Sequence, residues 1–194
     1  LGVGRLAKKN ALVQEMEAIE ALARVNVLCL DKTGTITTGE LKVEQVEMLD
    51  GNCSRNKVQE VMECMSYAFE ETNATTDALR RYFEDTRKRE IIERIPFSSK
   101  RKFMGITVRE NGTEKQYCLG APEYLTDDRT AIRKAEHFSA EGMRVLLLME
   151  KEPVALVVLS DIIKDDAAET FRFFREKDVE ILSLIHISEP TRPY

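Results

Sequence analysis

One run of apolar residues constrains the fold of this chain more than any other feature. The run Val25–Leu30, "VNVLCL", is apolar at nearly every position and stops at Asp31. A strand that is apolar on consecutive positions is typical of a parallel sheet covered on both faces. The reactive site of such sheets lies beyond the carboxyl ends of their strands. The sequence therefore predicts a buried strand that carries the carboxylate of Asp31 to the functional edge of an α/β sheet.

The residues that follow Asp31 supply what a phosphoryl group requires from a protein. A carboxylate can attack a phosphoryl group and form an aspartyl-phosphate. The transferred group carries negative charge, so the site needs hydrogen-bond donors and a cation. The residues expected to act in catalysis are Asp31, Lys32, Thr33 and Thr35, with flexible backbone at Gly34. Asp31 and Thr33 are also expected to hold a magnesium ion (Mg2+), which prefers oxygen ligands.

The motif Asp31-Lys32-Thr33-Gly34-Thr35 resembles the phosphorylation motif of P-type ATPases, cation pumps built on a haloacid-dehalogenase-like (HAD-like) core. The plainer alternative is an aspartate that merely ends a strand. Specified residues at every position of the motif, directly after a buried strand, disfavour that alternative. The resemblance covers residues 1 to about 181. It implies an α/β fold in which a parallel, Rossmann-like phosphorylation domain is interrupted by an antiparallel α+β nucleotide-binding domain.

The order of predicted elements agrees with an interrupted domain. Alternating apolar residues predict a half-exposed strand over 41–49, and helical spacing predicts helices over 57–69 and 75–85. Asn111-Gly112 is a strong hairpin signal, and Val154–Leu159 reads as another continuous apolar strand.

Four segments follow from this order and from the resemblance. The chain begins with Leu1 rather than Met, so we expect an internal piece of a longer protein. Residues 182–192 match the in-frame translation of a common sequencing-library adaptor. The predicted segments are 1–40, the end of a membrane-helix stalk and the first part of the phosphorylation domain; 41–159, the nucleotide-binding domain; 160–181, the start of the returning phosphorylation domain; and 182–194, a non-native tail.

The segment "IPFSSKRKFMGI" resembles one that contacts the nucleotide in this family. The resemblance implies that Phe97 stacks on adenine and that Lys102 approaches the nucleotide. Stacking on an aromatic face and a cation near phosphate are sound physical reasons for both roles. From composition alone, Phe97 would be a core aromatic and Lys102 a solvated strand charge. The predicted roles therefore depend on the resemblance.

Further segments of the insert resemble the same family. In "LGAPE", Gly120 would let the backbone approach the base, and Leu119 replaces a lysine of the family, which removes one expected contact. In "AEGMRVLLL", Arg144 is expected to reach the nucleotide phosphates. In "NATTDAL", Thr76 stands where an acidic residue is common, in a loop that faces the adenine. The predicted nucleotide-binding residues are Thr76, Phe97, Lys102, Gly120 and Arg144.

The segment "SDIIKDDA" departs from the family pattern. Pumps of this family often carry an Asp-Pro-x-Arg hinge there, and this chain keeps Asp161 but has Ile162 and Lys164 in place of the proline and the arginine. Because proline fixes the backbone φ angle, the hinge is expected to be less rigid here.

The resemblance implies a fragment of an ATP-driven cation pump that forms an aspartyl-phosphate from ATP and Mg2+. The fragment would be the cytosolic portion of an integral plasma-membrane protein, whose transported cation and membrane helices lie outside this chain. A non-catalytic ATP-binding module and a soluble HAD-type phosphatase are the alternatives. Thr33 disfavours a phosphatase, because many phosphatases of this core carry a second aspartate there as general acid and base. This chain alone is expected to be inactive, since family motifs that complete the magnesium site are missing from it.

Composition excludes other classes of protein. Lys and Arg total 29 against 34 Asp and Glu, for a net charge of -5, so a nucleic-acid-binding surface is not expected. No apolar run approaches the roughly 18 residues of a membrane helix.

Overall fold

Strands and helices form most of the chain that the computed structural model describes, which is residues 4, 7–8, 12, 14–49, 51, 53–84 and 90–183. The chain divides into two compact units, Leu1–Thr38 together with Ile163–Tyr194, and Gly39–Ile162. The predicted domain limits at residues 40 and 159 lie close to the limits of these units. Most of the predicted tail, residues 184–194, lies outside the described residues. Within the described ranges, no helix has both the length and the apolar character needed to cross a bilayer.

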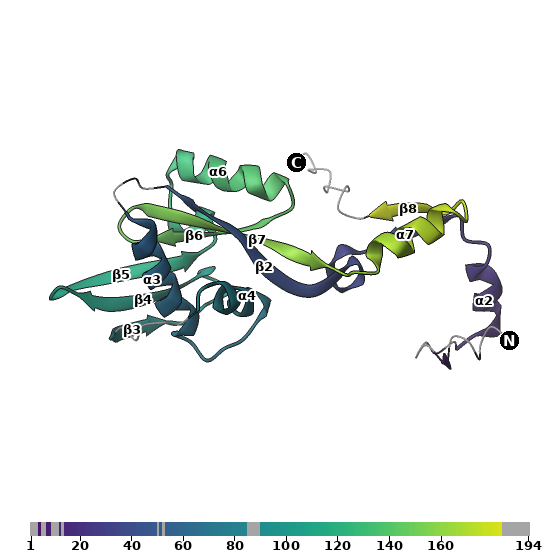
Figure 1. Cartoon of the computed structure of the whole chain (residues 1–194), viewed down its shortest axis with the longest axis horizontal. Coiled ribbons are helices and arrows are strands. Elements are labelled where there is room, and N and C mark those ends of the chain that lie inside the picture. Colours follow the sequence, from purple (N-terminus) through teal and green to yellow (C-terminus); the bar gives the residue numbers. More distant parts are fainter. Residues whose placement is uncertain are drawn as a thin grey trace. The chain divides into compact units, whose positions relative to one another are not determined.

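The smaller unit contains a short parallel pair of strands (Figure 1). Strand β1 (Val27–Leu30) pairs in parallel with β8 (Glu180–Ser183). Helix α2 (Met16–Leu22) precedes β1, and helix α7 (Ala167–Arg175) precedes β8. Parallel strands need a long crossover between them, and here residues 31–179 supply it. The predicted combination of a parallel element with a long insert is confirmed.

Strand β1 differs from its prediction in burial. Its side chains alternate between exposed and half-buried, and Val27 is 40% exposed. The prediction of a strand buried on both faces is therefore wrong for the described part of the chain. The physical reason is that the parallel sheet has two strands there, so few neighbours cover β1.

The larger unit contains a six-stranded sheet, with antiparallel pairing from β7 across to β3. Asn111 and Gly112 join β4 to β5 with φ angles of 49° and 80°, as a tight hairpin turn requires. The predicted hairpin and the antiparallel α+β character of the insert are confirmed. The strands lie in the order β2 (Thr37–Met48), β7 (Pro153–Ile163), β6 (Arg144–Met149), β5 (Thr113–Gly120), β4 (Phe103–Glu110) and β3 (Ile91–Ile95).

Helices cover both faces of this sheet (Figure 1). The helices α3 (Arg55–Tyr67) and α4 (Ala74–Tyr82) pack in the main core, and α6 (Arg129–Ala140), after the short α5 (Pro122–Leu125), packs in a second one. Strand β7 serves both cores, because successive side chains of a strand face opposite sides. Val157 belongs to the main core and its neighbour Leu156 to the second.

Side-chain caps explain where the longer helices begin. Ser54 Oγ accepts a hydrogen bond from the Lys57 amide at the start of α3, as serine commonly does at the N-terminus of a helix. Asn73 begins α4 with a capping box, in which Asn73 and Thr76 satisfy each other's backbone groups. Asp128 Oδ1 accepts from two amides at the start of α6. These caps fix the N-terminal ends of α3, α4 and α6, the helices that pack against the sheet.

Gly120, at the end of β5, is required by a close approach of backbone to backbone. A Cβ atom at this position would lie 2.4 Å from the Lys102 carbonyl oxygen and 2.4 Å from the Phe103 Cβ. Gly120 stands directly opposite Phe103 in the β4–β5 pair. The close neighbours are backbone and a Cβ, which cannot rotate away. Backbone packing therefore requires a glycine at position 120, whether or not a ligand binds.

We predict that Gly120→Ala lowers the free energy of unfolding by about 3 kcal/mol, because overpacking of a rigid site is costly. Urea unfolding followed by circular dichroism measures the change. Gly51→Ala is the control, since a Cβ there meets nothing within 4 Å. Equal stability of the two variants would contradict the close approach.

Candidate functional site

A pocket of about 520 Å³ in the larger unit collects the residues that were predicted to bind a nucleotide. Its volume lies in the range usual for small-molecule sites. The predicted residues that line it are Thr76, Phe97, Lys102, Gly120 and Arg144. They come from separate segments of the chain, which the sheet and helix α4 bring together. Besides Phe97, the apolar side chains of the lining are Phe69, Ala74, Met104, Leu119, Ala121, Val145 and Leu146.

Phe97 lies on the connection between β3 and β4 and leaves 53% of its surface exposed. An exposed phenylalanine at the wall of an apolar pocket offers a flat face on which another ring can stack. Leu119, which replaces a family lysine, is 2% exposed and belongs to both the main core and the pocket lining. The position is therefore apolar and adds no charge to the pocket.

Two cations line the same pocket. Lys102 has a φ of 60°, in the left-handed region, and its amide donates to the Ser98 carbonyl at 2.7 Å. Arg144 begins β6, and its Nη1 donates to Thr75 Oγ1 at 2.8 Å. Both side chains are exposed, so both charges remain available to an anionic group in solvent.

Thr76 takes part in the start of helix α4 rather than pointing a free hydroxyl at the pocket. Its Oγ1 accepts from the Asn73 amide at 2.8 Å and donates to the Asn73 carbonyl at 3.0 Å. The residue is 9% exposed. The predicted contact between Thr76 and a base remains a prediction, and its hydroxyl is engaged within the helix cap.

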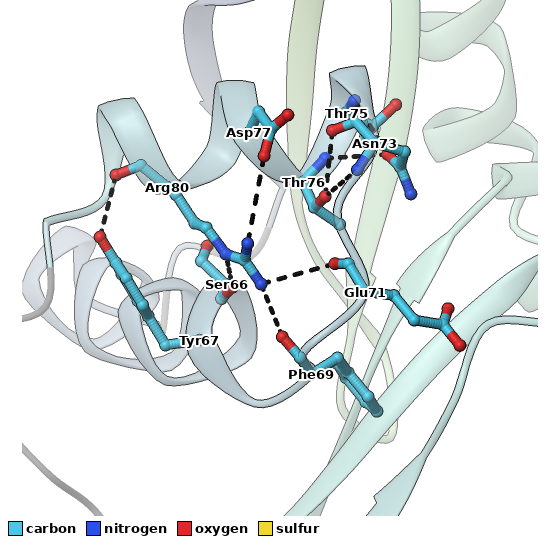
Figure 2. A network of polar contacts seen from close by, with 9 residues as sticks. All are labelled: Ser66, Tyr67, Phe69, Glu71, Asn73, Thr75, Thr76, Asp77 and Arg80. Atoms are coloured by element: carbon cyan, nitrogen blue, oxygen red, sulfur yellow. Dashed lines mark hydrogen bonds and ion pairs between the residues drawn. The ribbon is translucent and has the colours of Figure 1, made fainter.

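Arg80 organises the pocket wall and was not found by sequence reasoning (Figure 2). Its Nε donates to the Ser66 carbonyl at 2.9 Å, and its Nη2 donates to the Phe69 carbonyl at 2.6 Å. The same Nη2 lies 3.5 Å from the Glu71 carbonyl. Phe69 and Glu71 both line the pocket. On an amphipathic helix, an arginine is typical of a solvated face, so the sequence carries no signal of this role.

The thiol of Cys118, next to Leu119 on β5, is half-buried. Burial raises the pKa of the Cys118 thiol above its usual range. The thiol is therefore protonated at neutral pH and is a poor nucleophile. It takes no part in the candidate chemistry.

The smaller unit contains Asp31, which directly follows β1 with an exposed side chain. Thr33 and Thr35 are exposed as well. The loop Lys32–Ile36 makes one irregular helical turn, with Gly34 at a φ of 76°. The structure thus places the carboxylate at the carboxyl end of a parallel strand, as the sequence predicted.

Two residues brace this loop. Thr37 is fully buried, and its Oγ1 accepts from the Gly34 amide at 3.3 Å and lies 3.4 Å from the Lys32 carbonyl. Lys164 donates from Nζ to the Gly34 carbonyl at 2.9 Å and from its amide to the Ile36 carbonyl at 3.0 Å. Lys164 replaces the arginine of the family hinge. The loop that Lys164 contacts is distant in sequence, and no sequence pattern predicts this contact.

Metal binding was also predicted for this loop. The described residues contain no cluster of three or more His, Cys, Asp and Glu side chains suited to a metal ion. Asp31 and Thr33 would thus supply an incomplete ligand set by themselves. Magnesium binding at these two residues remains a prediction.

We predict that Thr37→Val lowers the free energy of unfolding by about 1 kcal/mol, because the loop loses its buried hydroxyl. Amide hydrogen exchange at Gly34 should accelerate, since that amide donates to Thr37 Oγ1. Thr35→Val is the matched control, with an exposed side chain in the same loop. Unchanged exchange in Thr37→Val would show that the hydroxyl does not brace the loop.

Proteins of similar sequence are ATPases by name, whereas no family model matches the chain. The calcium-transporting ATPase CtpE of Mycobacterium tuberculosis is 37% identical over 195 residues, which cover 93% of this chain and 24% of that protein. The Streptococcus pneumoniae protein named "Probable cation-transporting ATPase exp7" is 35% identical over 190 residues, which cover 90% and 24%. The chain therefore spans about a quarter of the length of these curated relatives.

Solved structures of similar fold also carry ATPase names. A zinc-transporting PIB-type ATPase in its E2.Pi state matches with a TM-score of 0.70 and 21% identity, over 94% of this chain and 29% of that one. The catalytic domain of the CPx-ATPase CopB-B matches with a TM-score of 0.63 and 12% identity, over 93% and 62%. At such identities the likeness is one of fold, and it agrees with the fold class predicted from the sequence.

Proposed function

The chain is homologous to one segment of the cation-transporting P-type ATPases, and on that premise we propose that its pocket binds ATP and that Asp31 accepts the γ-phosphate in the longer protein. One observation carries the proposal. Residues chosen for nucleotide binding from separate sequence segments all line the same pocket. Residues selected without a common function would have no reason to converge in this way.

The pocket offers each part of ATP a matching surface. The apolar lining with the exposed face of Phe97 suits the adenine ring, because stacking is favourable on any aromatic face. Lys102 and Arg144 suit the phosphates, because both are exposed cations of the pocket lining. The pocket supports binding through the residues of this chain alone.

The proposed chemistry at Asp31 is a phosphoryl transfer. A carboxylate oxygen of Asp31 forms a bond to the γ-phosphorus of ATP, the bond from that phosphorus to the bridging oxygen breaks, and ADP leaves. Lys32 and the hydroxyls of Thr33 and Thr35 are the proposed partners of the transferred group. Thr33 offers no carboxylate to activate water, so hydrolysis of the product at this site would be slow.

Two other functions are alternatives for this chain. Binding of ATP without turnover is favoured for the chain by itself, because the pocket lies wholly within Gly39–Ile162. A soluble HAD-type phosphatase is disfavoured by Thr33, as the sequence predicted. An assay with aryl phosphates as substrates distinguishes a pump fragment from a phosphatase. The pump fragment should be inactive in this assay, whereas a phosphatase should hydrolyse the substrates.

The remaining proposals concern the longer protein. We place this segment on the cytosolic side of a membrane whose helices lie outside the chain, and its cargo is a cation. Calcium is the first ion to test, because the relatives at 37% identity are named as calcium-transporting ATPases.

We predict that Phe97→Ala weakens ATP binding about tenfold, since stacking of a base on an aromatic side chain contributes ~1–3 kcal/mol. Isothermal titration of the chain with ATP measures the change. Phe173→Ala is the control, because Phe173 is 55% exposed, against 53% for Phe97, and does not line the pocket. Equal affinity in the wild type and in Phe97→Ala would remove the stacking proposal.

A further inference from the structure

Lys164 is hydrogen-bonded to the loop Lys32–Ile36 through both its backbone and its side chain. Its amide donates to the Ile36 carbonyl at 3.0 Å, and its Nζ donates to the Gly34 carbonyl at 2.9 Å. Its own carbonyl accepts from the Ala167 amide at 3.1 Å, at the start of helix α7. The residue thus connects this loop to a helix of the same unit, although 130 positions separate it from Gly34.

The backbone contact explains how a lysine side chain can be placed with little loss of entropy. A lysine that is held at its far end alone gives up much rotamer freedom, and this loss offsets most of the gain from one hydrogen bond. Lys164 is half-buried, and its backbone is already held beside the loop by the amide bond to Ile36. Less freedom therefore remains to be lost when Nζ bonds the Gly34 carbonyl.

Gly34 is the point of the loop at which the backbone is least restricted. Its φ of 76° lies in the left-handed region, which glycine enters without steric cost. No atom of another segment lies within 4 Å of the position that a Cβ would take there. Steric contacts therefore do not select one orientation of the backbone at Gly34, and its hydrogen bonds must do so.

Hydrogen bonds hold Gly34 on both sides. Its amide donates to Thr37 Oγ1 at 3.3 Å, and its carbonyl accepts from Lys164 Nζ. The peptide bond that joins Gly34 to Thr35 is planar and trans, so its N–H points opposite to its C=O. A Gly34 carbonyl that is held by Lys164 therefore directs the Thr35 amide away from Lys164, to the other side of the loop.

The residues on either side of Gly34, Thr33 and Thr35, are the proposed partners of the transferred phosphoryl group. Donors stabilise developing charge best when they are already oriented toward the place where it will appear. A displacement of about 1 Å can cost on the order of a hundredfold in rate. A loop whose Gly34 peptide turns over freely would present both threonines correctly for only part of the time.

We propose that Lys164 is a positioning residue for phosphoryl transfer, whose Nζ holds the Gly34–Thr35 peptide in the orientation that presents Thr33 and Thr35 to the transferred group. Lys164 acts through the backbone of the loop and does not touch the reacting atoms. The inference rests on the proposed phosphorylation of Asp31. Since Lys164 and the loop belong to the same unit, the role is exercised within that unit.

The test separates the rate of phosphoryl transfer from the binding of ATP. Lys164→Met keeps an unbranched side chain, removes the donor and leaves the backbone bond to Ile36 in place. The longer protein is labelled with saturating ATP that is radiolabelled at the γ-phosphate. The rate constant should fall about tenfold, as expected when a charged hydrogen bond is lost. The affinity of this chain for ATP, measured by titration, should stay unchanged, because the pocket lies in the other unit.

Two further variants show whether the donor of Lys164 is responsible. Lys164→Arg should recover most of the rate, since arginine also donates hydrogen bonds. Lys177→Met is the matched control and should keep the wild-type rate. Lys177 is an exposed lysine of the same unit, and its amide donates to the Phe174 carbonyl rather than to the loop. Amide hydrogen exchange at Gly34 should accelerate in Lys164→Met but not in the control.

The outcomes distinguish this inference from the proposed function. A labelled wild type with an unchanged rate constant in Lys164→Met would overturn the role of Lys164 and leave the phosphorylation of Asp31 standing. An equal loss of rate in Lys177→Met would overturn the role as well. So would a lower final amount of label at an unchanged rate constant, which is the result of a merely structural role. If the wild type formed no label, the proposed function itself would fail, and this inference with it.

Discussion

Burial of strand β7 on both faces is the constraint on which the larger unit depends. The run Val154–Leu159 is at most 5% exposed, and its side chains enter two separate cores. The helices α3 and α4 pack on one side of the sheet and α6 on the other because this strand offers apolar groups to both. Each fully buried Val or Leu contributes about 1.5–3 kcal/mol relative to an exposed one. The pocket is a consequence of this packing, since β6 and helix α4 carry Arg144 and Thr76 into its lining.

The pocket also depends on polar contacts that pin irregular backbone. Gly120 admits the close approach of β4 and β5, the capping box starts α4, and Arg80 fastens the connection that precedes it. The loop after Asp31 is held in the same way, because Thr37 and Lys164 form hydrogen bonds to its backbone groups. In both units, several of the residues proposed to meet ligand, among them Asp31, Phe97 and Lys102, are exposed, while buried or bridging neighbours hold nearby backbone. Such preorganisation lowers the entropic cost of binding.

Much of this arrangement follows from residue patterns, and some of it does not. The hairpin at Asn111-Gly112 has a local cause, so the sequence predicts it well. The exposure of β1 was not predicted, because burial depends on strands elsewhere in the sheet rather than on the apolar run itself. The pocket residues were predicted by resemblance, and their convergence required the fold. The roles of Arg80 and Lys164 were missed, because each depends on carbonyls distant in sequence, which no periodicity reveals.

Phosphorylation of Asp31 is the central claim, and the most direct measurement is covalent labelling of the longer protein with ATP radiolabelled at the γ-phosphate. The account predicts an acid-stable, hydroxylamine-sensitive label that disappears in Asp31→Asn and persists in Asp165→Asn, a change at another exposed aspartate of the same unit. A label retained in Asp31→Asn would contradict it.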